Sequence, residues 1–324
     1  EIASCLVGSE MCIRDRLRIA VVGCKNMGKK HVAVLRGHFA DRVEIAGILN
    51  SSAESSARVA AELNVPYFKN LDDIDRETAD AVIVATPGIT HAEIGAALLA
   101  RGLPCLIEKP LATTPSGCEK LIAAAREGQT FILPGHSENY NPAVVRLKEE
   151  LHSPIVRIRG IRTSRNAANK TGISAVQELM IHDLAIVYSL LGSDIRKAEV
   201  GKRSDLSWEN HAVAEMEYKN GASVKLEALR EDREIERFMD IDDTGGNTFH
   251  IDFTERRLLK NGRILTEGGN SLQNELTNFL NSVEGKEIPK VSAEEAANIL
   301  KLCLKLEQNP SMIDYFKVYK NEGR

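Results

Sequence analysis

The first part of the chain alternates short apolar runs with amphipathic stretches of helical period. The apolar runs cover residues 17–23, 43–50, 80–87, 103–110 and 130–135. They are apolar on both faces, as strands of a parallel sheet buried between helices must be. The segments between them predict helices, including one from Met27 to about Phe39 and one over 52–64 with Ser51 or Ser52 as its N-cap. This alternation predicts βαβ units, and therefore a doubly wound α/β sheet of the Rossmann type.

From about residue 135 the pattern changes to alternating apolar and polar positions, which is typical of antiparallel strands with one covered face. The predicted strands cover residues 154–164, 211–220, 222–230 and 236–246, with Asn220-Gly221 as a turn signal. Helices predicted at about 176–191, 271–284 and 292–307 would cover this sheet. The sequence therefore predicts a Rossmann domain over 17–134 and a C-terminal α+β domain over 135–324 with a large, mostly antiparallel sheet.

Composition narrows the class of protein. The chain has 324 residues, of which 43% are hydrophobic and 27% charged, and its formal charge of −4 sets up no strong field for nucleic acid. No apolar run approaches the roughly 20 residues of a membrane span. Six cysteines are scattered without metal-ligand spacing, which favours reduced thiols and a cytoplasmic location. We expect a soluble protein with no metal, nucleic-acid or membrane partner.

Residues 1–16 show neither strand alternation nor a sustained apolar stripe. We expect them to form a non-native-looking leader outside the fold, because the stretch CLVGSEMCIRDR resembles translated sequencing-adapter sequence. A secretory signal is the alternative interpretation. Glu1, Glu10 and Asp15 speak against it, since no uninterrupted apolar core of the usual length remains.

A glycine-rich turn follows the first predicted strand. The turn lies between a buried strand and a helix and contains Gly23, Lys25, Asn26, Met27 and Gly28. In dinucleotide-binding proteins the backbone N–H groups of such a turn and the helix N-terminus face a pyrophosphate. Lys25 occupies the second glycine position of the usual G-x-G-x-x-G pattern. A βα turn without a ligand is the alternative interpretation of this segment.

The end of the second strand bears on the choice of cofactor. An acidic residue that binds the adenosine ribose is usual there, but this chain has Asn50, Ser51 and Ser52. No carboxylate repels a 2′-phosphate, and Lys25 would be a positive partner for one, which favours NADP over NAD. Lys25 pointing into solvent and Asn50 binding the ribose are the alternatives, so the expected cofactor is NAD(P).

Several segments together resemble the glucose-fructose oxidoreductase, inositol dehydrogenase and rhizopine-catabolism (Gfo/Idh/MocA) family. They are GCKNMG (23–28), ATPGITH (85–91), EKPLATT (108–114), GHSENYNPAV (135–144) and ELMIHD (178–183). The resemblance extends from Leu17 almost to the end, and within the family the later segments are similar to the UDP-N-acetylglucosamine 3-dehydrogenase type. It implies a nicotinamide-dependent oxidoreductase whose C-terminal domain binds substrate and forms a dimer or tetramer through its sheet.

The resemblance assigns catalysis to Lys109 and His182, with Glu178 completing the group. Oxidising a secondary alcohol requires a base for the hydroxyl proton, which histidine supplies, while a lysine ammonium stabilises the developing alkoxide. Glu178 precedes His182 by four residues in a predicted helix, so its carboxylate would orient the imidazole or contact a second sugar hydroxyl. The family usually has aspartate at that position. A buried structural histidine and a solvated strand-end lysine are the alternatives.

Other positions follow from the same resemblance. Thr86, Pro87 and His91 would line the nicotinamide side of the cofactor, although His91 could equally be a helix N-terminal residue without contact. Glu108 would bind the ribose or only the backbone. Asn141 precedes Pro142 and would cap a helix or face the nicotinamide.

Arg162 and Arg165 are candidate cations for a nucleotide-sugar diphosphate. Period-2 alternation places Arg162 with Ile158 on one face of its strand, and Arg157 and Arg159 on the other. Arg162 and Arg165 then reach one ligand only if the strand ends or bulges between them. Solvated arginines on an edge strand are the alternative.

The leading hypothesis is an NAD(P)-dependent dehydrogenase that acts on a secondary hydroxyl of a sugar, inositol or nucleotide-sugar, with the 3-hydroxyl of UDP-N-acetylglucosamine as the most specific candidate. A catalytically silent NAD(P)-binding sensor is the second hypothesis, favoured by the departures at Lys25 and Glu178. A third is a reductase of a non-sugar substrate such as an imine or a bilin, which the fold does not exclude.

Overall fold

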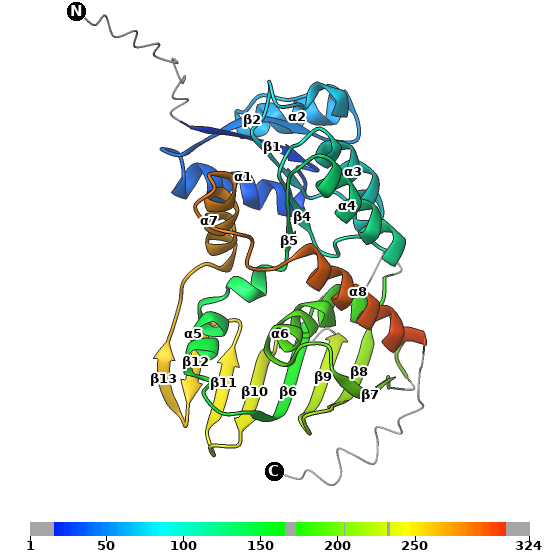
Figure 1. Ribbon diagram of the computed structural model, residues 1–324, viewed down its shortest axis with the longest axis vertical. Coiled ribbons are helices and arrows are strands. Elements are labelled where there is room, and N and C mark those ends of the chain that lie inside the picture. The colour runs from blue at the N-terminus through cyan, green and yellow to red at the C-terminus, as the bar shows by residue number, and fades with distance from the viewer. Residues whose placement is uncertain (1–15, 166–172, 204, 232–233, 309–324) are drawn as a thin grey trace, which may run out of the picture.

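The computed structural model describes residues 16–165, 173–203, 205–231 and 234–308, and it contains two separate β-sheets placed one above the other along the long axis (Figure 1). Apart from Arg16, the predicted leader lies outside the described residues. In the described part of the chain, no helix is long and apolar enough to cross a membrane.

The first sheet is parallel and has the strand order β2-β1-β3-β4-β5. Its strands are β1 (Leu17–Val22), β2 (Val43–Leu49), β3 (Ala81–Val84), β4 (Cys105–Glu108) and β5 (Ile132–Gly135). The connecting helices are α1 (Asn26–His38), α2 (Ala53–Leu63), α3 (His91–Ala100) and α4 (Pro115–Glu127). The order reverses between β1 and β3, and the crevice at the carboxyl ends of these strands is where ligands bind in open α/β sheets. The predicted Rossmann sheet is confirmed.

The second sheet has eight strands in the order β13-β12-β11-β10-β6-β9-β8-β7. Its strands are β6 (Ile155–Ser164), β7 (Ile195–Gly201), β8 (His211–Tyr218), β9 (Ser223–Arg230), β10 (Arg237–Asp243), β11 (Thr248–Asp252), β12 (Arg257–Lys260) and β13 (Arg263–Thr266). All neighbours are antiparallel except β6 and β9. The predicted mostly antiparallel sheet is confirmed, although β7 and β11 to β13 were not among the predicted strands.

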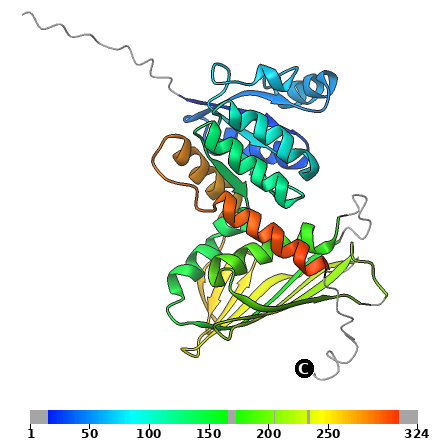
Figure 2. The same cartoon turned by 45° about the vertical axis from the view of Figure 1, so that its right-hand side comes forward.

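Helices cover one face of the large sheet and leave the other open (Figure 2). The cover consists of α5 (Pro142–Glu150), a π-helical turn over Val176–Met180, and α6 (Ile181–Leu191), with α8 (Ala293–Gln308) crossing from the upper sheet to the lower one. The two ends of α8 pack in different cores, because Ala296 and Leu300 join the core of the first sheet while Leu302 and Leu306 join that of the second.

The predicted position of the helix over residues 271–284 is wrong. Helix α7 (Ser271–Val283) was expected to cover the large sheet, but its apolar residues Leu276, Phe279 and Leu280 pack with α1 against the Rossmann sheet. The apolar stripe of α7 shows that one face of the helix is buried, but it does not show which sheet buries that face. In the structure the chain returns to the first sheet, and the stripe packs there. This return places residues of α7 behind the end of β4.

Candidate active site

The glycine turn after β1 has the geometry of a pyrophosphate site. Gly23 has a φ of +90°, and a Cβ there would lie 2.5 Å from the backbone nitrogen of Thr86; a Cβ on Gly28 would lie 2.4 Å from the carbonyl oxygen of Gly23. Among the described residues, the N–H groups of Asn26, Met27 and Gly28 at the start of α1 have no hydrogen-bond acceptor. These donors and the positive end of the α1 dipole suit the pyrophosphate of a dinucleotide.

Lys25 and the end of β2 form the rim of this turn. Lys25 is exposed and has a φ of −101°, so the backbone itself does not require glycine there. The side-chain Oδ1 of Asn50 accepts a hydrogen bond of 2.8 Å from the Cys24 N–H, which ties the turn to the end of β2. Ser51 and Ser52 are exposed, and Ser52 is the N-cap of α2. No carboxylate follows β2, as the sequence indicated.

The turn after β3 is held by a buried histidine. Thr86 is half-buried and Pro87 is exposed. His91 begins α3 with no exposed surface, and its Nδ1 and Nε2 each lie 2.8 Å from a carbonyl oxygen, those of Pro110 and Thr86 respectively. His91 thus fastens the β3 turn to the β4 turn as the first residue of α3, and its place on the nicotinamide side of the cofactor stays a prediction.

Lys109 follows β4 and extends toward the second sheet. Its Nζ donates a hydrogen bond of 3.0 Å to the carbonyl oxygen of Glu178, which is 69 residues away in the π-helical turn. Burial lowers the pKa of the lysine, and the charges of Glu108 and Glu178 partly oppose this shift. Lys109 is therefore a half-buried cation at the junction of the two sheets.

His182 lies at the start of α6, one turn beyond Glu178. Its Nδ1 is buried and has no hydrogen-bond partner in the described part of the chain. Burial lowers its pKa well below the ordinary value, and the positive charges of Lys109 and Arg162 lower it further. The imidazole is therefore neutral at physiological pH and able to accept a proton.

The Glu178 carboxylate does not contact the imidazole as expected. It is paired with the guanidinium of Arg230 at the end of β9. The expectation considered only neighbours on the same helix, whereas Arg230 reaches the carboxylate from β9; residues 176–180 also form a π-helical turn instead of a regular α-helix. The four-residue spacing was therefore not a reliable sign of contact.

Arg162 is engaged in a buried ion-pair network. Its guanidinium binds both oxygens of Asp183 at 2.8–3.1 Å and Glu138 at 3.1 Å, and only 3% of the residue is exposed. Strand β6 is central in the sheet, so the edge-strand alternative is wrong. Arg165 follows β6 and is exposed, so the structure does not bring it to this network. Arg162 joins β6 to α6 and to the segment before α5.

Asn141 is a helix cap. Its side-chain oxygen accepts a hydrogen bond of 3.1 Å from the Ala143 N–H, and its amide donates to Glu138 at 3.0 Å. The structure therefore shows the capping alternative. Glu108 does not contact the backbone alone, because its Oε1 lies 2.8 Å from His31 Nε2; its contact with the ribose stays a prediction.

Four residues near Lys109 were not found by sequence reasoning: His31, His136, Arg230 and Glu275. The burial pattern of the sequence contained signs of two of them. His31 falls on the apolar face of α1 with Val32 and Leu35, and Arg230 continues the buried face of β9. A charged or titratable residue at a core position indicates a buried polar cluster.

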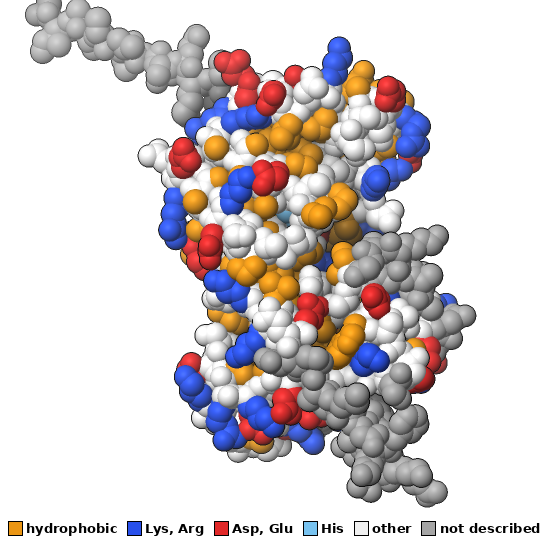
Figure 3. Space-filling view, turned by 90° about the vertical axis from the view of Figure 1, so that its right-hand side faces the viewer, with side chains coloured by type: hydrophobic (Ala, Val, Ile, Leu, Met, Phe, Trp, Pro, Cys, Tyr) orange, Lys and Arg blue, Asp and Glu red, His pale blue; other side chains and the backbone are white. Residues whose placement is uncertain are grey.

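On the surface, hydrophobic side chains extend over the middle of one face, where the two halves meet, and charged side chains dominate its lower end (Figure 3).

Comparisons with known proteins agree with this architecture. Residues 17–136 match the model of the Gfo/Idh/MocA family, described as an oxidoreductase family with an NAD-binding Rossmann fold. UDP-N-acetylglucosamine 3-dehydrogenase of Acidithiobacillus ferrooxidans is 30% identical over 69% of this chain and 71% of its own length. Inositol 2-dehydrogenase of Klebsiella pneumoniae is 27% identical over 57% of each chain, so the match spans little more than half of that relative.

Solved structures extend the likeness to the C-terminal sheet. The Acidithiobacillus ferrooxidans UDP-N-acetylglucosamine 3-dehydrogenase superposes with a TM-score of 0.84 at 24% identity, covering 91% of this chain and 98% of the other. GenD2 from gentamicin A biosynthesis, solved in complex with NAD, gives a TM-score of 0.77 at 21% identity, with 91% and 94% covered. The resemblance seen in the sequence is confirmed: the chain belongs to the Gfo/Idh/MocA oxidoreductase family and is a nicotinamide-dependent dehydrogenase.

Proposed function

We propose that this dehydrogenase oxidises a secondary hydroxyl of a sugar, inositol or nucleotide-sugar, or reduces the corresponding ketone, with Lys109 and His182 as its catalytic residues. The observation that carries the proposal is the position of the Lys109 ammonium. It extends from the carboxyl end of β4, the edge where ligands of open α/β sheets bind, to the carbonyl oxygen of Glu178, and its charge acts on the nearby His182 ring. The substrates of the relatives named above support the class, and UDP-N-acetylglucosamine is the first substrate to test.

The chemistry needs two protein groups. In the oxidation, neutral His182 accepts the hydroxyl proton while the Lys109 ammonium donates a hydrogen bond to the same oxygen and stabilises its negative charge. The alcohol becomes a ketone by losing this proton to His182 and a hydride from its carbon, for which a nicotinamide held at the glycine turn would supply the acceptor. Gly23, Gly28 and the N–H groups at the start of α1 would hold the pyrophosphate of that cofactor.

We also propose a preference for NADP over NAD. Lys25 is exposed at the rim of the turn, and Asn50 replaces the acidic residue that would repel a 2′-phosphate. Fluorescence titration with NADH and NADPH tests this preference directly. A lower dissociation constant for NADH would overturn it.

The experiment for the main proposal follows absorbance of the reduced nicotinamide with UDP-N-acetylglucosamine, myo-inositol and simple sugars, each with NAD⁺ and NADP⁺. Lys109→Met and His182→Ala should each bind cofactor normally but lose about a hundredfold or more of kcat. Lys120→Met and His152→Ala change exposed residues outside the site and serve as matched controls. Turnover retained by either site variant would contradict the catalytic assignment.

Other outcomes of this experiment separate the alternatives. Cofactor binding with no turnover of any alcohol would favour the NAD(P) sensor. Two features support that alternative: Lys25 departs from the family pattern, and the Glu178 carboxylate is already paired with Arg230. The non-sugar reductase is tested by adding an imine and a bilin, each with NADH and NADPH, and turnover of one of these alone would identify it.

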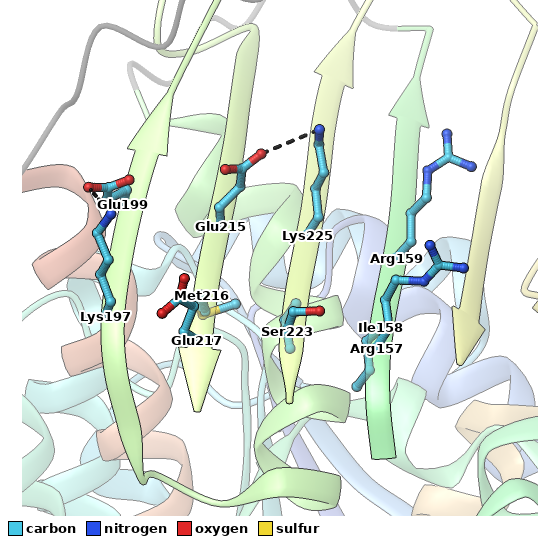
Figure 4. Close-up of a pocket in the computed structure, with 11 residues that line it drawn as sticks. Arg157, Ile158, Arg159, Lys197, Glu199, Glu215, Met216, Glu217, Ser223 and Lys225 are labelled. Carbon is cyan, nitrogen blue, oxygen red and sulfur yellow. Dashed lines mark ion pairs between the residues drawn. The ribbon is translucent and has the colours of Figure 1, made fainter. Parts of the chain in front are cut away.

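We further propose that the open face of the large sheet forms a dimer or tetramer interface. Acidic and basic side chains project from it in neighbouring rows, with a shallow hollow of about 300 Å³ among them (Figure 4). Lys225 pairs with Glu215 at 3.3 Å and Arg157 with Asp242 at 2.7 Å. Such rows of both signs are self-complementary about a twofold axis. Light scattering at low and high salt tests the assembly, and a monomer at both would refute it.

Two further expectations remain proposals. We divide the chain into an NAD(P)-binding domain over 17–134 and a substrate and oligomerisation domain over 135–324, supported by the two separate sheets. We place the protein in the cytoplasm, supported by the cysteines in the described part of the chain, which are free and buried: Cys24, Cys105, Cys118 and Cys303.

A further inference from the structure

A cluster of buried titratable groups lies behind Lys109 and takes no part in the mechanism above. His31 comes from α1, Glu108 from the end of β4, His136 from the end of β5 and Glu275 from α7. Their exposed fractions are 0%, 7%, 2% and 0% respectively. Two carboxyl groups are therefore enclosed in the same part of the interior, where placing two negative charges together is strongly unfavourable.

The contacts of the two carboxyl groups differ. Glu108 Oε1 lies 2.8 Å from His31 Nε2, and Glu108 Oε2 accepts a hydrogen bond of 3.3 Å from the backbone N–H of Lys109. Glu275 has neither kind of contact, because both of its oxygens lack a hydrogen-bond partner in the described part of the chain. The framework therefore supports a charge on Glu108 and offers no support for one on Glu275.

The electrostatics follow these contacts. Burial raises the pKa of Glu275 well above its ordinary value, and the Glu108 charge raises it further. Burial acts in the same direction on Glu108, but the hydrogen bond and charge of His31, followed by the charge of Lys109, outweigh it and hold the pKa of Glu108 below its ordinary value. At neutral pH Glu108 is ionised and Glu275 carries a proton.

We propose that His31 is a positioning residue which decides that Glu108, and not Glu275, is the ionised carboxyl group of this pair, and so maintains a negative charge beside Lys109. The proposal rests on the proposed catalytic role of Lys109. The link is short, because Glu108 and Lys109 are consecutive and the Glu108 carboxylate also binds the Lys109 N–H. Since His31 lies on α1, it joins the helix of the cofactor turn to the residue that would contact the substrate oxygen.

The charge on Glu108 matters because some groups around Lys109 favour its ammonium form and others disfavour it. Burial disfavours the ammonium form, and so do the nearby guanidinium groups of Arg162 and Arg230, whereas Glu108 and Glu178 favour it. Other titratable groups that interact with the lysine are His136, His182 and Cys303. Of the two favourable carboxylates, Glu178 is already paired with Arg230. Removing the Glu108 charge would therefore shift Lys109 toward its neutral form, which stabilises an alkoxide poorly.

The test compares His31→Leu, which removes the ring nitrogen, with His31→Gln, which keeps an N–H donor. His38→Leu changes an exposed histidine at the other end of the same helix and is the matched control. The first readout is the pH titration of Lys109, followed by NMR after reductive ¹³C-methylation, with its resonance assigned by its loss in Lys109→Met. The second is the pH profile of kcat/KM.

His31→Leu should move the Lys109 titration to lower pH and reduce kcat/KM at pH 9, relative to pH 7, by about tenfold more than in the wild type. His31→Gln should restore most of both effects, and His38→Leu should change neither. An unchanged Lys109 titration in His31→Leu would overturn the proposal. If that variant does not fold, Glu108→Gln takes its place, and a titration that it leaves unchanged is equally contradictory. Absence of turnover in the wild type would defeat the proposed function but leave the NMR test intact.

Discussion

Replacing Glu275 with glutamine should remove a pH dependence from the stability of the protein. Glu275 is completely buried, and its pKa in the folded protein is raised well above the ordinary value by burial and by the charge of Glu108. In the unfolded chain it ionises near the ordinary carboxyl value of about 4.3. Folding therefore takes up one proton at any pH between these two values. The stabilisation by the protonated group is fully present below the unfolded pKa and is lost as pH rises toward the folded pKa.

The size of the effect follows from proton linkage. One proton taken up on folding changes the free energy of unfolding by about 1.4 kcal/mol per pH unit. Between pH 5 and pH 7 Glu275 alone therefore removes up to about 2.7 kcal/mol from the wild type, while glutamine has a similar shape and remains neutral throughout. The stability difference between Glu275→Gln and the wild type should grow in favour of the variant across this range.

Urea unfolding followed by circular dichroism at pH 5, 6, 7 and 8 measures this difference. Glu294→Gln is the matched control, because it removes a largely exposed carboxyl group on α8 that has only a distant ion pair with Arg126 at 3.4 Å. Its stability difference from the wild type should not vary by more than a few tenths of a kcal/mol over this range. A pH-independent difference for Glu275→Gln would refute the reasoning, since it would show that Glu275 has the same ionisation in the folded and unfolded states.

Three other changes test the framework of the site. Arg162→Leu leaves Asp183 buried without its cation and should cost about 3–5 kcal/mol of stability in urea unfolding; a loss below about 1 kcal/mol would contradict the network. Gly28→Ala places a methyl group 2.4 Å from the Gly23 carbonyl oxygen, so NADH affinity in fluorescence titration should fall about tenfold or more, whereas unchanged affinity would remove the glycine turn from the cofactor site. Lys25→Gly should weaken NADPH more than NADH, and an equal change in both would exclude contact with a 2′-phosphate.

The sequence predicted most of what depends on local pattern. The apolar runs located β1 to β5, and the rule that ligands collect at the carboxyl ends of parallel strands placed Gly23 and Lys109 at one edge. The alternation of β6 correctly put Arg162 and Arg157 on opposite faces of the strand, of which the structure buries the first and exposes the second. These inferences succeed because the period of side-chain burial is fixed within an element.

What could not be predicted depends on how distant elements meet. The apolar stripe of α7 was visible, but a stripe does not specify which sheet it covers, so Glu275 could not be placed beside Glu108, 167 positions earlier. The partner of Glu178 is likewise distant in sequence, because Arg230 at the end of β9 lies 52 positions further along the chain. The role of a charged residue at this junction was therefore determined by its tertiary partner.

The pairing of charged groups at this junction gives a physical reason for the catalytic role that we propose for Lys109. Each neighbouring carboxylate has its own partner from another element: Asp183 has Arg162, Glu178 has Arg230, and Glu108 has a contact of 2.8 Å with the His31 ring. In the described part of the chain Lys109 has no carboxylate within ion-pair distance, and its Nζ donates instead to a backbone carbonyl oxygen, which carries no net charge. A lysine in a close ion pair would already have its charge compensated and would gain little from a substrate alkoxide. Because the nearby carboxylates have other partners, the ammonium is available for the role that we propose, in which it would stabilise the negative charge that develops on the substrate oxygen.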